Sequence, residues 1–523
     1  MHRNIERQKK ILEAVQRRAS LKNCRRDFPE YNIPLATLLS QDRTRTSSRR
    51  EMEIITESPI IPTGEVPPRI LPLEVRVAIK SMKPGTAPEP DFISADFLRA
   101  GGHPLHVISA AHMTSYLQKE GIPDQWKTSR TVLIYIKGDL RNYRSICMLS
   151  VLYKVFTKII LKRISRMLDE AQPQEQAAFR QGFTCLDHIQ TVSSVIEFCR
   201  EYRLPLVLTF VDYEKTFDRV ETNAIPSAVV VQGVDASYVR TLANCYGRCT
   251  TKSNLRFADD IVLFSSSASE AETMLNELNE AGKRIGLRMN RKEDTVHENA
   301  YCEDGGVQLE GSQIVETSSY VYLGRSMNME NHLEKELNRR MRVAWAAFTV
   351  ISEATDQQTD QDRRAHLFDS TVLPALCYAA VTWADTAATS GKLLTSHRVL
   401  ERCLRKFNRR TQQLAGLRSS DLRELSRLRG LVEYISKAKR RWAGYIMRRT
   451  DDSWTKRTPE RIPRDAKRPR GRPPTRWGNV FTARMDQLRA QLDTAQGPRQ
   501  RHSRSLRTSW MTMARERNEW RRC

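Results

Sequence analysis

Three aspartates stand where carboxylates do chemistry rather than packing. Asp212 follows the apolar run VLTFV, and Asp259 and Asp260 separate LRFA from the apolar run IVLF. Carboxylates that meet at the ends of neighbouring strands repel one another and favour divalent metal ions. Two Mg²⁺ ions (Mn²⁺ is the alternative) about 3.5–4 Å apart would support in-line phosphoryl transfer. The pattern therefore predicts Asp212, Asp259 and Asp260 as catalytic and metal-binding residues.

An Asp-Asp pair is a weak signal by itself. Asp451-Asp452 has the same two letters without flanking apolar runs. A solvated hairpin turn is the alternative for Asp259-Asp260. The apolar runs on both sides, and the separate Asp at the end of another strand, favour the catalytic interpretation.

Two strands and a helix must position these carboxylates. Residues 206–211 predict a short apolar strand, and residues 257–264 predict a strand, a tight acidic turn and a second strand. Ser269 and Glu272 predict a capping box, which opens a helix that Gly286 ends.

The remaining pattern is mostly helical. We expect helices over 93–100, 104–120, 149–171, a single helix over 223–246, and later helices over 331–353, 361–386, 391–415, 420–448 and 506–521. Strands are expected within 126–136 and in a hairpin over 314–324. This order predicts an α+β catalytic domain followed by an all-α domain.

The charge is concentrated at one end of the chain. The chain has 523 residues and a net charge of +25, and residues 401–523 hold 34 Lys and Arg against 12 Asp and Glu. Such a basic region attracts nucleic acid, although a solvated basic surface is the alternative. The balance excludes an acidic solvating protein and disfavours an enzyme of small metabolites without a macromolecular partner.

Several segments bear on localisation. The ten cysteines form no CxxC pair, the start MHRNIERQKK has no apolar core of a signal peptide, and no apolar run approaches the length that spans a bilayer. We therefore expect a soluble intracellular protein of the nucleus or cytoplasm, with no membrane partner.

At this point the sequence resembles a known family. FVDYEKTFDRV (210–220) and LRFADDIVLF (255–264) are similar to motifs A and C of reverse transcriptases from non-LTR retrotransposons, of the RTE-type branch. Further blocks that resemble the family follow in its order: APEPDFISADFLRAGG (87–102), GDLRNYRSICMLSVLYKVFTKII (138–160), QAAFRQGFTCLDHIQTV (176–192), GLRMNRK (286–292), SYVYLGRSM (319–327) and KRPRGRPPTRW (467–477).

The resemblance implies a fold and an activity. The fold would be α+β: right-hand polymerase fingers and palm with an RRM-like palm sheet, followed by an all-α thumb and a basic helical C-terminal region. The expected boundaries are a basic linker over 1–59, fingers and palm over 60–327, the thumb over 328–415 and the basic region over 416–523. The activity would be RNA-directed DNA polymerisation, with Mg²⁺, dNTPs, an RNA template and a DNA primer or target DNA.

The resemblance also implies roles for residues beyond the three aspartates. Lys137, Arg144 and Lys292 would hold the incoming triphosphate, with plain surface charge as the alternative. Phe217 would exclude a ribose 2′-hydroxyl, with a core aromatic as the alternative. Tyr322, Leu323 and Gly324 would lie in a primer-grip hairpin, with an ordinary hairpin as the alternative.

The basic segment at 467–477 has a mechanism of its own. Its prolines keep the chain extended, so that its arginines can enter a narrow minor groove, as in an AT-hook. The predicted nucleic-acid-binding residues are Arg468, Arg470, Arg472 and Arg476. A nuclear-import signal and nonspecific phosphate contacts are the alternatives.

The sequence departs from the family between motifs A and C. Asp212 and Asp259 are 47 positions apart, and the RQGDxxSPxLF pattern of motif B is missing, as if cut out near Lys252 and Ser253. We also expect the upstream endonuclease domain to be lacking. Three interpretations stay open: a reverse transcriptase, a catalytically inactive nucleic-acid-binding relic of such an element, and a structural or interaction protein.

Overall fold

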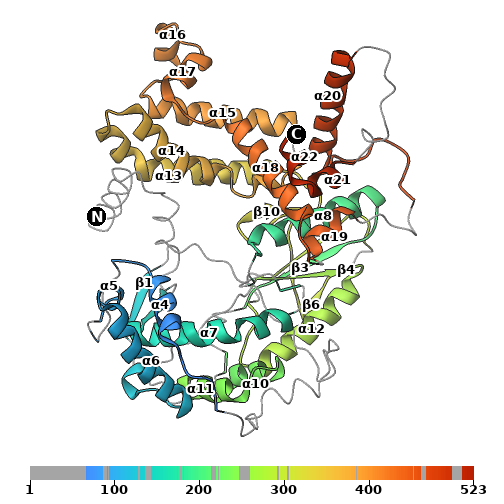
Figure 1. Cartoon of the computed structure of the whole chain (residues 1–523). Coiled ribbons are helices and arrows are strands. Elements are labelled where there is room, and N and C mark those ends of the chain that lie inside the picture. The colour runs from blue at the N-terminus through green and yellow to red at the C-terminus, as the bar shows by residue number, and fades with distance from the viewer. Residues whose placement is uncertain are drawn as a thin grey trace.

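The computed structural model places a small sheet between two helical lobes (Figure 1). It describes residues 66–85, 91, 93–127, 130–135, 143–172, 175–176, 180, 182–213, 220–221, 223–246, 260–290, 294–302, 305–384, 386–451, 453–460, 467–496 and 509–522. The N-terminal lobe lies at the bottom of Figure 1, the C-terminal lobe lies at the top, and the sheet connects them.

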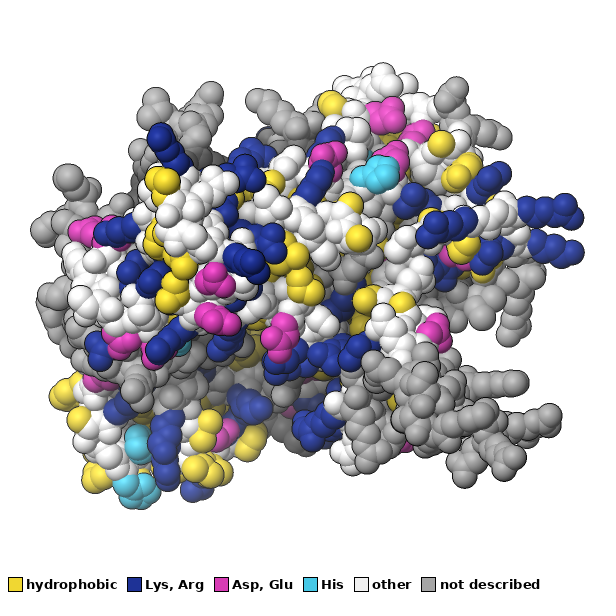
Figure 2. All heavy atoms as spheres, turned by 90° about the horizontal axis from the view of Figure 1, so that it is seen from above, with side chains coloured by type: hydrophobic (Ala, Val, Ile, Leu, Met, Phe, Trp, Pro, Cys, Tyr) yellow, Lys and Arg dark blue, Asp and Glu magenta, His cyan; other side chains and the backbone are white. Residues whose placement is uncertain are grey.

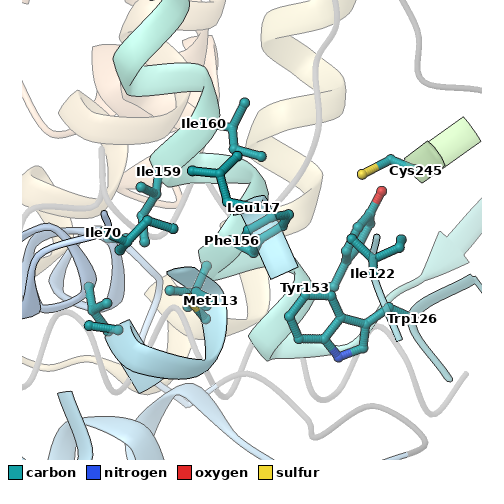
Figure 3. Close-up of a cluster of buried hydrophobic side chains, with 14 of the residues drawn as sticks. Ile70, Met113, Leu117, Ile122, Trp126, Tyr153, Phe156, Ile159, Ile160 and Cys245 are labelled. Carbon is teal, nitrogen blue, oxygen red and sulfur yellow. The ribbon is translucent and has the colours of Figure 1, made fainter. Parts of the chain in front are cut away.

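The N-terminal lobe is a helical cluster around an aromatic centre. Its helices are α4 (Pro72–Lys80), α5 (Ala95–Ala100), α6 (Gly102–Gln118), α7 (Val151–Ala171), α10 (Ala224–Val231) and α11 (Ala236–Tyr246), with a short 3₁₀ turn η1 (Asp124–Lys127). Trp126 packs against Tyr153 and Phe156 of α7, with ring centroids 5.8 and 5.6 Å apart (Figure 3). The hairpin of β1 (Arg130–Tyr135) and β2 (Tyr143–Met148) belongs to the same part of the chain.

Residues 223–246 differ from the expectation of a single helix. Two helices form instead, α10 and α11, and Gly233 separates them with a φ of +76°. That left-handed conformation costs glycine little and interrupts helical hydrogen bonding. The prediction of one helix was wrong because Gly233, within the apolar run AIPSAVVVQGV, ends the first helix.

The sheet has four strands in the order β4–β3–β5–β8. They are β3 (Val207–Val211), β4 (Ile261–Ser265), β5 (Thr295–Glu298) and β8 (Val315–Glu316), with β3 antiparallel to both β4 and β5. Alternate side chains of β3 enter different cores. Val207 and Val211 pack with α12 (Ala268–Arg284), whereas Leu208 and Phe210 pack with α8 (Cys185–Tyr202). The period-two alternation therefore places α12 and α8 on opposite faces of the sheet.

Helix α12 forms where the sequence predicted a helix, but its cap differs. Ser267, not Ser269, is the N-cap, and its Oγ accepts a hydrogen bond from the backbone N–H of Glu270. The Glu270 carboxylate in turn accepts from the backbone N–H of Ser266 at 2.8 Å. A reciprocal cap thus forms two residues before the predicted one, because the run SSSASE offers several capping serines.

A hairpin joins the sheet to the C-terminal lobe. Strands β9 (Tyr320–Tyr322) and β10 (Arg325–Met327) pair with each other, and α13 (Glu334–Gln357) follows. The hairpin expected over 314–324 therefore lies a few residues later, and β8 of that range pairs with β5 instead. The remaining helices are α14 (Gln361–Leu376), α15 (Ala387–Leu404), α16 (Arg409–Leu414), α17 (Ser419–Ser426), α18 (Leu431–Met447), α19 (Trp454–Glu460), α20 (Asn479–Gln496), α21 (Trp510–Arg515) and α22 (Arg517–Arg522), with a 3₁₀ turn η2 (Ala380–Thr382).

Four of the helices predicted for this lobe are shorter than expected or broken. The helix expected over 361–386 ends at Leu376, and the one expected over 506–521 divides into α21 and α22. The expected helix over 391–415 divides into α15 and α16 around Lys406, and the expected helix over 420–448 divides into α17 and α18 at Arg427. Both residues have left-handed backbones, with φ of +59° and +55°. One core cluster runs from Leu333 through Leu400 to Ile435, so packing continues past residue 415, where the thumb was expected to end. Within the described residues, no helix is long and apolar enough to cross a membrane.

The end of the C-terminal lobe is held by aromatic packing. Trp477 is 2% exposed, and its ring centroid lies 5.1 Å from that of Phe481 and 5.7 Å from that of Trp510. Its indole N–H donates to the backbone carbonyl of Val381 at 2.6 Å. This cluster fixes the basic segment at 467–477 against the body of the protein.

Replacing Trp477 with alanine should destabilise the C-terminal lobe by about 3–5 kcal/mol, because a cavity replaces a buried indole. Urea unfolding followed by intrinsic fluorescence measures the loss, and limited proteolysis locates it. Trp345→Ala is the matched control, since Trp345 is 39% exposed. An equal loss in both variants would contradict the packing role of Trp477.

Candidate active site and nucleic-acid interface

Asp212 and Asp260 occupy facing positions at one end of the sheet. The last paired residues of β3 and β4 at this end are Val211 and Ile261. Asp212 follows the first and Asp260 precedes the second, so the antiparallel register sets the two aspartates opposite each other. Directly opposed residues in such a pair have Cα atoms about 4.5–5.5 Å apart. Asp259, the third predicted carboxylate, lies outside the described residues.

A loop after α12 orients Asp212. The backbone N–H of Asp212 donates to Asp294 Oδ1 at 3.0 Å, and its carbonyl accepts from the backbone N–H of Asn290 at 2.8 Å. The Asn290 side-chain amide also donates to Asp212 Oδ2 at 3.1 Å. Asn290 and Asp294 were missed from the sequence. Asn290 lies in the GLRMNRK block, but no spacing rule connects that block with a strand 78 residues earlier.

The arrangement is partly that of a metal site. Two half-buried carboxylates face each other, and carboxylate oxygen is the ligand that Mg²⁺ prefers. Among the described residues no group of three His, Cys, Asp or Glu side chains is close enough together to hold a metal ion. Asp212 and Asp260 are therefore two oxygen donors of the kind that would hold Mg²⁺.

The β9–β10 hairpin reaches this end of the sheet. Tyr322 is 1% exposed, and both its burial and the negative charge of Asp260 raise the pKa of its phenol. The Tyr322 hydroxyl lies 3.2 Å from Nδ1 of His188 on α8, and burial lowers the pKa of this imidazole to about 4. A neutral tyrosine and a neutral histidine thus connect the hairpin to α8 near the acidic pair.

The hairpin turn itself faces the C-terminal lobe. Leu323 and Gly324 have φ of +47° and +77°, as in a two-residue turn of type I′. The Leu323 carbonyl accepts from the Tyr378 hydroxyl at 2.9 Å. The Gly324 carbonyl accepts from Arg339 Nη1 at 2.7 Å and also from Arg340. A Cβ at Gly324 would lie 3.3 Å from the Tyr378 ring, so the close approach to that ring favours glycine.

Arg325 fixes the hairpin from beneath. It is 1% exposed, and its Nη1 donates to Ser193 Oγ of α8 at 2.5 Å and to Thr382 Oγ1 of η2 at 2.8 Å. Burial lowers its pKa to about 10, which still leaves the guanidinium charged at neutral pH. One buried cation thereby ties the predicted primer-grip hairpin to α8 and to the C-terminal lobe. The sequence offered no signal for this role.

Three of the four predicted substrate-binding residues, Lys137, Phe217 and Lys292, lie outside the part of the chain that the structure describes. Arg144 lies in β2, where its backbone pairs with that of Ile134. Their proposed roles therefore stay predictions.

The four predicted arginines of the basic segment divide into two pairs. Arg476 and Arg468 both form ion pairs with Glu201 of α8, the second at 3.8 Å. Arg470 and Arg472 are exposed and flank Gly471, which has a φ of +123° and nothing within 4 Å of its Cβ position. The segment is therefore anchored on both sides of an exposed Arg-Gly-Arg tip.

Glu197 completes the anchor. It is 6% exposed on α8, and its carboxylate accepts from the backbone N–H of Trp477 at 3.0 and 3.1 Å. Burial raises its pKa from 4.5 to about 7, against the opposing effect of that hydrogen bond and of three nearby cations, Arg325, Arg476 and Lys439. Farther along α8, Asp187 pairs with Arg449 at 2.8 Å. The carboxylates of Asp187, Glu197 and Glu201 on α8 thus bind residues of the basic C-terminal region.

Comparisons with known proteins place the chain among transposon-encoded sequences. The family model described as reverse transcriptase (RNA-dependent DNA polymerase) matches residues 135–248. A putative uncharacterized transposon-derived protein of Caenorhabditis elegans is 36% identical over 271 residues, which are 51% of this chain and 93% of that protein.

Two further relatives match shorter segments. The probable RNA-directed DNA polymerase from transposon BS of Drosophila melanogaster is 26% identical over 30% of this chain and 18% of its own length. The retrovirus-related Pol polyprotein from type-1 retrotransposable element R1 of Bradysia coprophila is 27% identical over 30% of this chain and 16% of its own length. The chain spans less than a fifth of each of these two relatives.

The raised pKa of Glu197 predicts a pH-dependent stability. Between about pH 4.5 and pH 7 the folded state keeps a proton that the unfolded state releases. The stability from this group is therefore complete below that window and is lost as the pH rises through it, by about 1.4 kcal/mol per pKa unit. Glu197→Gln lacks this titration.

The measurement compares the urea stabilities of the wild type and Glu197→Gln at about pH 5 and about pH 8. Relative to the wild type, the variant should gain stability at the higher pH, because every other titration cancels in the difference. The same difference at both pH values would show that Glu197 does not titrate in this window.

Proposed function

The chain belongs to the family of transposon-derived reverse transcriptases, and on this premise we propose that it is a non-LTR retrotransposon polymerase of the RTE-type branch. The register-opposed pair of Asp212 and Asp260 carries the proposal. This pair supports a palm active site, because reverse transcriptases hold their metal ions with carboxylates at the ends of adjacent palm strands. The order of the sequence blocks supports the RTE-type branch.

In this proposal Asp212, Asp259 and Asp260 hold two Mg²⁺ ions. When bound, the metal would activate the primer 3′-hydroxyl and stabilise the leaving pyrophosphate. Asn290 orients the Asp212 carboxylate through its amide, and Asp294 holds the backbone at that point. Lys137, Arg144 and Lys292 would contact the triphosphate, and Phe217 would select deoxyribose.

The domain assignment follows from the same premise. We assign fingers and palm to 60–327, the thumb to 328–415 and the basic region to 416–523. The continuous core from Leu333 to Ile435 packs the proposed thumb and the start of the basic region together in one lobe. The four-stranded, mostly antiparallel sheet supports an RRM-like palm.

A second candidate is a binding protein without polymerase activity. Only 47 positions separate Asp212 from Asp259, and within the described part of that interval the helices are α10 and α11. We infer that motif B, which supports the template base in the family, is deleted here. A chain without this support would retain nucleic-acid binding through its basic region while losing templated synthesis.

Primer extension separates the two candidates. With an RNA template, a DNA primer, dNTPs and Mg²⁺, we expect extension by the wild type and none by Asp259→Ala/Asp260→Ala, because the metal ligands are gone. Asp169→Ala/Glu170→Ala removes two charges from the surface of α7 and should extend like the wild type. No extension by a folded wild type that still binds nucleic acid would establish the second candidate.

The exposed tip of the basic segment predicts a separate effect on duplex binding. Arg470→Gln/Arg472→Gln should weaken binding to A·T-rich duplex DNA about tenfold and lower the salt slope by about 1.8, since two phosphate-contacting cations are lost. Fluorescence anisotropy across salt concentrations measures both. Arg166→Gln/Arg363→Gln, on exposed surface sites elsewhere, carries the same charge change. Equal weakening in the two pairs would attribute binding to net charge alone.

A further inference from the structure

A groove in the C-terminal lobe has the composition of a nucleic-acid site. It has a volume of about 380 Å³ and lies between α15, α18 and α20 (Figure 1). Its lining includes Leu393, Leu431, Phe481, Lys439, Arg440 and Arg484. These lining residues include three cations and no carboxylate, so the groove favours an anion.

The floor of the groove is apolar. Leu393 and Leu431 are 3% and 1% exposed, and Phe481 is 4% exposed. Val432 is 48% exposed, which is unusual for a valine on a packed helix. Leu393, Leu431 and Phe481 are buried beneath the groove, so it is Val432 among these four that offers exposed apolar surface to a base or a sugar.

The cations stand on two walls of the groove. Lys439 and Arg440 come from α18, and Arg484 comes from α20. Lys439 is 1% exposed and donates from Nζ to the Trp383 carbonyl at 2.5 Å, so it supports the wall. Arg484 is exposed, and its Nη1 lies 3.5 Å from Gln487 Oε1. A phosphodiester between the walls would be approached by Arg440 from one side and Arg484 from the other.

The space-filling view shows how basic this lobe is. Dark blue Lys and Arg side chains are spread over the face seen from above in Figure 2, with fewer acidic side chains between them. Residues 401–523 carry 34 basic and 12 acidic residues. Charge complementarity therefore favours a polyanion as the occupant.

We propose that this groove binds single-stranded nucleic acid, with Arg440 and Arg484 on the phosphates and the apolar floor beneath a base or sugar. The proposal rests on the proposed function, because it adds a strand-binding site to a nucleic-acid enzyme. It differs from the Arg470–Arg472 tip, for which binding to duplex DNA is predicted above. The recognised chemistry is a phosphodiester strand, which RNA and DNA share.

The test measures anisotropy of a fluorescent 12-nucleotide oligouridine, and of the matching oligothymidine, with the full chain. Arg440→Gln/Arg484→Gln should weaken binding about tenfold and lower the salt slope by about 1.4, the value for two contacts to a single strand. Arg398→Gln/Arg441→Gln is the matched control. Its exposed arginines lie on α15 and α18 outside the groove, so it should bind within about twofold of the wild type.

A second measurement locates the bound strand on the protein. A 4-thiouridine oligonucleotide, photo-crosslinked to the wild type, should label peptides from 431–447 or 479–487, and the label should fall in Arg440→Gln/Arg484→Gln. Circular dichroism and thermal unfolding confirm that each variant is folded. If the groove variant loses affinity only for oligouridine, the groove binds an RNA strand. If it loses affinity for both oligonucleotides, the groove binds a strand of either RNA or DNA.

Several outcomes would overturn the proposal. Equal weakening in the groove and control variants, or crosslinks confined to other segments, would exclude the groove as the binding site. Nucleic-acid binding elsewhere on the chain would still stand. If the folded wild type does not bind the oligonucleotide at low salt, both the proposed groove site and the proposed function are contradicted. Displacement of the oligonucleotide by an acidic amphipathic peptide, but not by unlabelled oligouridine, would assign the groove to a protein partner.

Discussion

Helix α8 must be buried on two sides, and much of the structure follows from that constraint. One side carries Ile189, Val192 and Ile196 against the sheet. Another side carries carboxylates and hydroxyls that are equally buried, among them Asp187 and Glu197 at 1% and 6% exposure. Buried carboxylates are stable only with partners, and here the C-terminal lobe supplies them. The sheet, the hairpin and the basic region are therefore arranged around one helix.

The basic charge of the C-terminal region consequently has two uses. Arg449 and Arg476 are held by carboxylates of α8, and Arg325 neutralises the surroundings of Glu197 from the hairpin side. Their cost of burial is offset by hydrogen bonds and opposite charge. The arginines that stay exposed, such as Arg470 and Arg472, are the ones available to phosphates. Net charge alone would have assigned all of them to nucleic acid.

The sequence predicted elements whose signals are local. Apolar runs marked β3 and β4, and helical periodicity marked α7 and α12, so that the facing of Asp212 and Asp260 could be anticipated. It did not predict the support of Asp212 by Asn290 and Asp294, because that contact depends on how a distant loop returns to the sheet. The breaks at Lys406 and Arg427 were also missed, since non-glycine residues carry no sequence signal for a left-handed backbone. The sequence also did not predict that Arg468 and Arg476 pair with a carboxylate while the arginines between them stay exposed. That division depends on where Glu201 lies in the fold.

The packing of the sheet bears on the proposed deletion of motif B. Both faces of β3 are covered, by α8 and by α12, and neither helix comes from the interval between Asp212 and Asp259. Tyr213 and Val220 are the members of these two clusters that come from that interval, so most of the hydrophobic contacts that stabilise the sheet lie outside it. Arg325, Tyr322 and Glu197 likewise join parts that lie outside it. Loss of a template-supporting segment would thus remove contacts to nucleic acid without removing the contacts that fold the palm. With motif B deleted as proposed, stability and templated synthesis would be separable, and a folded protein that binds nucleic acid without extending a primer is physically coherent.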